Sequence, residues 1–119
     1  MSTTAKAVTI LEPGRIALRE YTVPECPEGG LIMKVEMCGI CGTEKHTYLA
    51  ETTQYGGTVN EQTSPFPLIP GHEVVGIADR VSPGKRDFYS RPIKEGDRIT
   101  ICQDIICGRC YNCRHIFRF

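Results

Sequence analysis

The chain has 119 residues, and its 14 Lys and Arg balance its 14 Asp and Glu, so the formal net charge is zero. This balance argues against nucleic acids and anionic membranes as partners, and the apolar runs are too short to span a bilayer. Residues 1–10 lack the basic start and apolar core of a signal peptide, so we expect one cytoplasmic domain over residues 1–119 with reduced cysteines.

Strand patterns dominate the chain. Ala5–Leu11 and Arg15–Tyr21 flank Pro13-Gly14, which predicts a hairpin whose second strand pairs back on the first. Three further strands are predicted at Leu31–Met37, His72–Val81 and Arg98–Cys102.

Helical patterns are scarce. The one candidate of note is Thr43–Leu49, and the polar segment Glu51–Pro67 is predicted to be a long loop with Thr58-Val59 at its centre. Several short strands with Gly and Pro between them and little helix favour an all-β, barrel-like domain.

Three thiols near the end of the chain have the spacing of a zinc site. Cys107, Cys110 and Cys113 are each separated by two residues on one predicted tight loop, and tetrahedral zinc takes sulfur ligands at this spacing. A structural zinc site has four ligands, and no fourth cysteine follows before Phe119, so we expect the lobe over residues 102–119 to be incomplete. The alternatives are buried or disulfide-linked cysteines, or a makeshift fourth ligand from water, Cys102 or His115.

A second constellation combines a thiol, an imidazole and a carboxylate. Cys41 follows the third predicted strand and His72-Glu73 opens the fourth, so the three side chains meet if these strands lie side by side. Such a set leaves one zinc position open for water or substrate, as catalytic sites do. Each residue also has a plainer interpretation: a packed thiol, a core histidine, a hydrogen-bonding carboxylate and, for nearby Thr43, a helix N-cap.

Three motifs carry a family resemblance in the expected order. They are Cys41-Gly42-Thr43-Glu44-Lys45-His46, Gly71-His72-Glu73-Val74-Val75-Gly76 and Cys107 through Cys113, with Gly96-Asp97-Arg98-Ile99 ahead of the last. With them the chain resembles the amino-terminal, GroES-like catalytic domain of zinc-dependent medium-chain alcohol dehydrogenases, which include sorbitol and threonine dehydrogenases. The resemblance implies a GroES-like, partly open β-barrel with a short helix and a C-terminal cysteine-rich zinc lobe.

The resemblance also implies roles for individual residues. Cys41 and His72 would bind the catalytic zinc, and Glu73 would be a direct or exchangeable ligand. Thr43 and His46 would form a proton relay. Glu44 stands where the family usually has Asp, as the acceptor that orients the zinc-bound imidazole. The C-terminal cysteine-rich lobe would supply three ligands of a structural zinc: Cys107, Cys110 and Cys113.

Some features of the family are missing from this sequence. No Gly-x-Gly-x-x-Gly occurs, and the Rossmann domain that holds the coenzyme is absent, which indicates truncation. Two loops, Glu51–Pro67 and Ser82–Lys94, look longer than usual for the family. We therefore expect NAD(P) chemistry on a small alcohol or carbonyl only with a separate coenzyme-domain chain. The alternatives are a free-standing, non-redox zinc module that forms homo-oligomers, and zinc-assisted hydrolysis.

Overall fold

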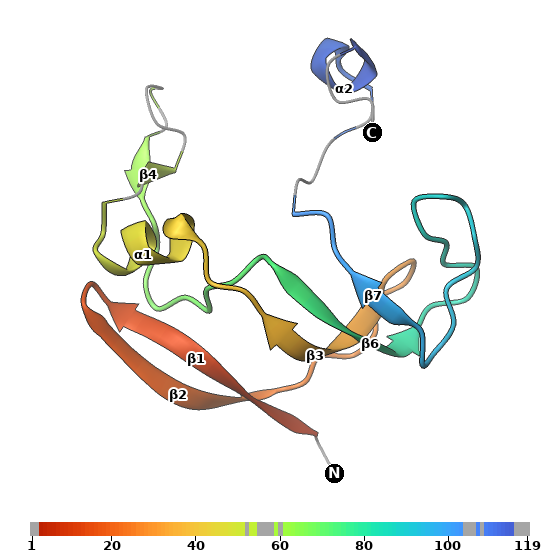
Figure 1. The fold of residues 1–119 in the computed structure, drawn as a ribbon, viewed down its shortest axis with the longest axis horizontal. Coiled ribbons are helices and arrows are strands. Elements are labelled where there is room, and N and C mark those ends of the chain that lie inside the picture. The colour runs from red at the N-terminus through yellow and green to blue at the C-terminus, as the bar shows by residue number, and fades with distance from the viewer. Residues whose placement is uncertain are drawn as a thin grey trace.

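In the part of the chain that the structure describes, small antiparallel β-sheets are joined by loops, with two short helices (Figure 1). The computed structural model describes residues 3–51, 53–54, 59, 61–103, 107 and 109–115. Its elements in chain order are β1 (Thr4–Glu12), β2 (Arg15–Thr22), β3 (Leu31–Cys38), α1 (Gly42–Tyr48), β4 (Thr53–Gln54), β5 (Gln62–Thr63), β6 (Val74–Val81), β7 (Arg98–Thr100) and α2 (Tyr111–His115).

The first two strands form the predicted hairpin. β1 and β2 pair antiparallel around a turn in which Gly14 adopts a φ of 77°, a conformation that glycine reaches without strain. Val8 lies opposite Leu18 and Ile10 opposite Ile16, so these apolar side chains share one face of the hairpin. Ile10 also exchanges backbone hydrogen bonds with Leu68, which ties the hairpin to the later chain.

The second sheet has the order β3-β6-β7, with β6 in the centre and both neighbours antiparallel. Gly76 of β6 is buried where the backbone of Lys34 approaches, and a Cβ at Gly76 would overlap that backbone carbonyl. The sequence prediction placed the start of β6 at His72, which is wrong: the strand begins at Val74, opposite Cys38, the last residue of β3. β7 likewise ends at Thr100 rather than at Cys102.

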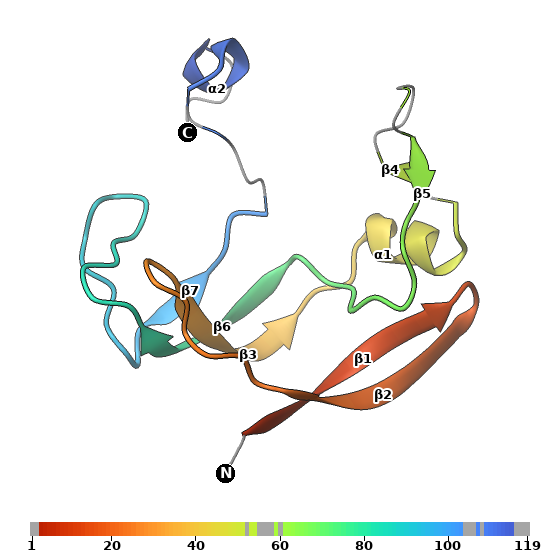
Figure 2. The ribbon, with the colours of Figure 1, turned by 180° about the vertical axis from the view of Figure 1, so that it is seen from behind.

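Two predicted loops contain regular structure. Within the segment predicted as one long loop, β4 pairs with β5 beyond α1 (Figure 2), while Thr58 at its predicted centre lies outside the described residues. The tight loop expected for the three late thiols contains α2, so Cys113 lies on a helical turn. The backbone N–H of Arg114 donates to the carbonyl of Cys110 and closes this turn.

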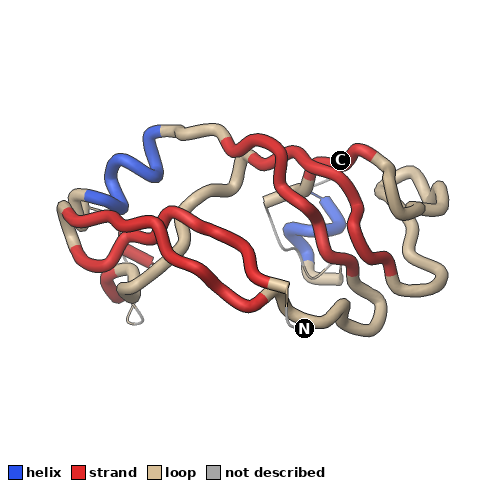
Figure 3. Tube along the Cα trace, turned by 90° about the horizontal axis from the view of Figure 1, so that it is seen from below, coloured by secondary structure: helices blue, strands red, loops and turns tan. Residues whose placement is uncertain are grey.

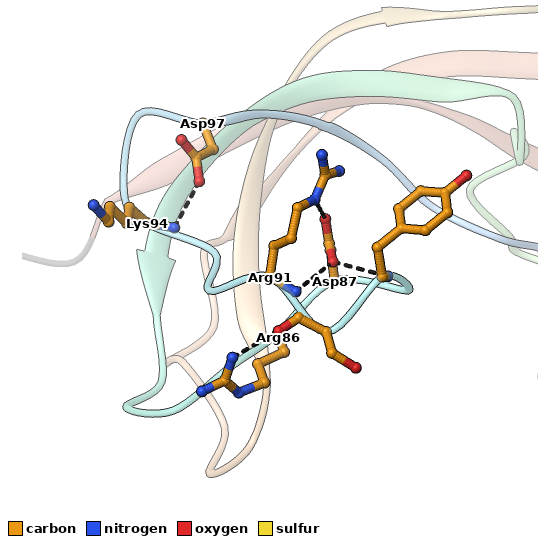
Figure 4. A network of polar contacts seen from close by, with 7 residues as sticks. Arg86, Asp87, Arg91, Lys94 and Asp97 are labelled. Carbon is orange, nitrogen blue, oxygen red and sulfur yellow. Dashed lines mark hydrogen bonds and ion pairs between the residues drawn. The ribbon is translucent and has the colours of Figure 1, made fainter.

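The loop between β6 and β7 is organised around Asp87 (Figure 4). Its carboxylate accepts hydrogen bonds from the backbone N–H groups of Tyr89 and Arg91, each at 2.9 Å, and from Nε of Arg91 at 2.7 Å. The Arg91 backbone N–H is the largest of the causes that hold the pKa of Asp87 below its ordinary value. The loop is exposed, but its own hydrogen bonds order it.

The sheets do not close into a complete barrel, and little of the chain is buried. Of the residues described, the buried apolar side chains are Ile10 and Ala78, at 2% and 1% exposure. The chain exposes 9412 Å², whereas a compact monomer of its mass exposes about 6,500 Å². The all-β, partly open architecture is therefore confirmed. No helix in the described part of the chain is long and apolar enough to cross a membrane.

Candidate metal centres

The first site brings together Cys41, His72 and Glu73. The Cys41 Sγ lies 3.3 Å from the His72 Nε2, and one ligand atom of each of the three side chains lies within 4.8 Å of the other two. The thiol of one segment and the imidazole of another thus converge, as the motifs predicted. Metal bonds of 2.0–2.3 Å in a tetrahedron place ligand atoms about 3.3–3.8 Å apart, so this spacing suits zinc.

The backbone explains why these segments meet. The end of β3 runs beside the start of β6, and the Gly39 N–H donates to the Glu73 carbonyl at 2.8 Å. A Cβ at Gly39 would overlap the Glu73 carboxylate, so only glycine leaves that side chain its position. Gly71, with a φ of 115°, turns the chain directly before His72.

Glu44 contacts two of the candidate ligands, His72 and Cys41. Its Oε1 lies 2.7 Å from the His72 Nδ1, and its Oε2 accepts a hydrogen bond from the Cys41 N–H at 2.9 Å. Because a carboxylate only accepts hydrogen bonds, the Nδ1–H of the ring donates to Glu44, which leaves Nε2 as the ring nitrogen that faces the Cys41 sulfur. The contact that the family resemblance implied for Glu44 is therefore present.

The Glu44 carboxylate also takes part in capping the start of helix α1. Cys41 is the N-cap, its Sγ accepts a hydrogen bond from the Thr43 N–H at 3.2 Å, and Glu44 completes a capping box. The alternative that Thr43 is the N-cap is wrong. Burial raises the pKa of Glu44, but hydrogen bonds from Cys41 and from its own N–H, together with the charge of His72, hold the pKa below its ordinary value.

The two candidate relay residues lie on α1. Thr43 lines a hollow of about 310 Å³ with Glu44 and Leu68, next to the candidate metal site. His46 Nδ1 lies 2.7 Å from a carboxylate oxygen of Glu51, and both side chains are about half exposed. Sequence reasoning missed Glu51, whose only signal is an acidic residue shortly after the helix.

The second site is the cysteine cluster. Cys113 Sγ lies 3.6 Å from Cys107 Sγ and 3.3 Å from Cys110 Sγ. Tetrahedral zinc thiolates with bonds of 2.3 Å place their sulfurs about 3.8 Å apart, so the cluster also suits zinc. Among the residues that the structure describes, this group has three ligands. His115, considered as a makeshift fourth, packs its ring against Tyr111, with centroids 4.6 Å apart.

The local backbone lowers the pKa of Cys107 and so favours its thiolate form. The backbone N–H groups of Arg109 and Cys110, followed by the thiols of Cys110 and Cys113, lower the pKa of Cys107 to about 7. A thiolate is the form of cysteine that binds metal. The hydrogen bonds within the cluster therefore favour the form of Cys107 that binds a cation.

The model of the alcohol dehydrogenase GroES-like domain matches residues 27–117, which is most of the chain. The chain belongs to this family. The probable alcohol dehydrogenase of Mycobacterium tuberculosis H37Rv is 30% identical over 109 residues, which make up 92% of this chain and 26% of that protein. L-threonine 3-dehydrogenase of Thermococcus kodakarensis is 36% identical over 98 residues, 82% of this chain and 25% of that protein.

A solved structure agrees with this assignment to the alcohol dehydrogenase family. A putative zinc-binding dehydrogenase from Sinorhizobium meliloti, bound to NADP, superposes with a TM-score of 0.72 at 36% identity and covers 96% of this chain and 29% of that one. This GroES-like chain thus spans about a quarter of the length of the curated relatives it matches.

Proposed function

We propose that this chain is the zinc-binding, catalytic portion of an NAD(P)-dependent alcohol or polyol dehydrogenase, with one domain over residues 1–119 and a cysteine lobe over residues 102–119. The observation that carries the proposal is the 3.3 Å approach of Cys41 Sγ to His72 Nε2, backed by the Glu44 carboxylate at 2.7 Å from His72 Nδ1. The similarity to a probable alcohol dehydrogenase and to an L-threonine 3-dehydrogenase supports it.

Three residues would hold the catalytic zinc: Cys41, His72 and Glu73. Zinc would supply Lewis-acid chemistry there toward the oxygen of a small alcohol or carbonyl substrate. Glu44 fixes the His72 ring, so the lone pair of Nε2 stays aimed at the site.

The chain's own residues would also move the proton. Thr43, beside the hollow next to the site, would pass it toward His46, whose ring Glu51 holds by hydrogen bond. A nicotinamide coenzyme on a separate coenzyme-binding domain would supply the hydride chemistry; the Sinorhizobium meliloti structure, which is bound to NADP, supports this part of the proposal.

The cysteine cluster would hold a second, structural zinc through Cys107, Cys110 and Cys113, with a fourth ligand still to be identified. A reducing compartment such as the cytoplasm would keep these thiols available for metal. In such a compartment metal binding is the usual use of closely spaced thiols.

Metal content per chain tests both sites. We expect Cys41→Ala and Cys107→Ala each to lose a different part of the bound zinc, measured by atomic emission on purified protein. Cys26→Ala is the matched control, because its thiol donates to the carbonyls of Pro27 and Arg80 and belongs to neither cluster. Full zinc content in both site variants would refute the assignment, as would an equal loss in the control.

A further inference from the structure

The cysteine cluster stands apart from the first metal site and is open to solvent. Figures 1 and 3 show helix α2, which carries Cys113, well away from helix α1, where Cys41 is the N-cap. Cys107 and Cys110 are exposed, and Cys113 is partly buried. Small solutes therefore reach these sulfurs directly, without passing the first metal site.

Backbone contacts hold the three sulfurs of the cluster together. The Cys110 N–H donates to the Cys107 Sγ at 3.4 Å, which ties the first thiol to the second residue. Cys110 and Cys113 are three residues apart across the first turn of α2, and the Arg114 N–H closes this turn on the Cys110 carbonyl at 3.1 Å. Because the sulfurs already lie close together, an ion that binds all three has little of the chain left to order.

The distances between the sulfurs fit a pyramidal ion more closely than a tetrahedral one. Cys113 Sγ lies 3.6 Å from Cys107 Sγ and 3.3 Å from Cys110 Sγ, and all three sulfurs lie within 4.8 Å of one another. Tetrahedral zinc thiolates place their sulfurs about 3.8 Å apart. A trivalent ion with a lone pair has bond angles nearer to a right angle, so at a bond length similar to that of zinc and sulfur, about 2.3 Å, its sulfurs lie about 3.3–3.4 Å apart.

Three thiolates also complete the coordination of such a pyramidal ion. Its lone pair occupies the direction in which zinc takes a fourth ligand, and the described part of the chain brings three ligands to this cluster. Thiolate sulfur is a soft donor, which selects soft ions. The first metal site instead combines one thiol with an imidazole and a carboxylate, a donor set that a soft ion binds less well.

We propose that Cys107, Cys110 and Cys113 together bind a trivalent, thiophilic metalloid ion, of which arsenite is the representative. Each thiol gives its proton to one hydroxyl group of As(OH)3, so that three As–O bonds break, three As–S bonds form and three water molecules leave. Arsenic stays trivalent, and the step therefore needs no oxidant or reductant. Arsenite and zinc compete for the same sulfurs, so arsenite should release zinc from the cluster but not from the first metal site.

Intact-mass spectrometry tests the proposal on the 119-residue chain, reduced with a phosphine, freed of zinc by a chelator and titrated with sodium arsenite. We expect one adduct per chain whose added mass is that of one arsenic less three hydrogens, which a three-thiol adduct alone has. Cys107→Ser should bind arsenite at least roughly tenfold more weakly, because two thiols of the cluster remain. Cys26→Ser is the matched control, since the Cys26 thiol donates to the carbonyls of Pro27 and Arg80 and should leave arsenite binding unchanged.

An unmodified mass, or an adduct that keeps one hydroxyl group and has lost two thiol hydrogens, would overturn the proposal. Equal arsenite affinity in Cys107→Ser and the parent would overturn it as well. If Cys107→Ser does not fold, the mass of the parent adduct decides, since it counts the bound sulfurs without any substitution. The inference and the proposed function fail separately: zinc in the cluster without arsenite uptake overturns the inference alone, whereas arsenite uptake in a chain whose first site takes no zinc overturns the proposed function alone.

Discussion

Glu44 offers the sharpest test of how the first metal site is built. Its side chain is only 13% exposed and makes two contacts, one to His72 Nδ1 at 2.7 Å and one to the Cys41 N–H at 2.9 Å. Glu44→Ala removes both contacts, so the imidazole loses its orienting acceptor and α1 loses half of its capping box. Glu44→Asp keeps the charge, but its shorter side chain spans only one of the two partners.

The expected size of the effect follows from these contacts. Loss of the partner behind a metal-binding histidine typically weakens metal binding 10–100-fold, or about 1.4–2.7 kcal/mol. Loss of the capping interaction costs about 1 kcal/mol of helix stability. We therefore expect Glu44→Ala to bind zinc about 10–100-fold more weakly and Glu44→Asp to fall between it and the parent.

The assay is chelator competition for zinc, made in the Cys107→Ala background so that the cysteine cluster does not contribute. Glu95→Ala, an exposed acidic position in the turn before β7, is the matched control for the loss of one negative charge. Zinc affinity in Glu44→Ala equal to that of the parent, or an equal loss in Glu95→Ala, would refute the role of the two contacts.

Three further outcomes are expected. In metal-free protein, the rate of Cys107 alkylation should be half maximal near pH 7 and decrease below it, since the pKa of Cys107 is lowered from 9.0 to about 7. Mass spectrometry measures this rate, and a half-maximal rate only near pH 9.0 would contradict the prediction. Gly71→Ala, at a φ of 115°, should lower the free energy of unfolding by about 1–3 kcal/mol in urea, whereas Gly42→Ala, whose added Cβ meets nothing within 4 Å, should not. The pKa of Asp87 is lowered in the folded loop, so its carboxylate should stabilise the fold above the ordinary value of 3.8. That stabilisation should be lost as the pH falls through the folded pKa. A carboxyl titration midpoint at or above 3.8, measured by NMR, would show the reasoning to be wrong.

The strands were predictable because their pattern is local. Alternating apolar residues around Pro13-Gly14 specify the β1–β2 hairpin, and the structure has it within one residue at each outer end. Strand ends were less predictable, because they depend on the partner. His72 and Glu73 have strand-like neighbours, yet β3 ends opposite Val74, and this leaves both side chains beside the site rather than in the ladder.

The convergence of Cys41 with His72 was predictable from motifs in two separate segments, and the structure places their side chains together. The short helix α2 was not, since five residues are too few to show a helical period. Glu51 beside His46 was also missed, because its only signal is an acidic residue shortly after the helix and both side chains are about half exposed.

The sulfur at the start of α1 has a practical use. Because the Thr43 amide points at the Cys41 sulfur, its NMR frequency should respond to every change in the charge or occupancy of that atom. The Thr43 amide signal would thus report metal binding at Cys41 without a dye or a substrate.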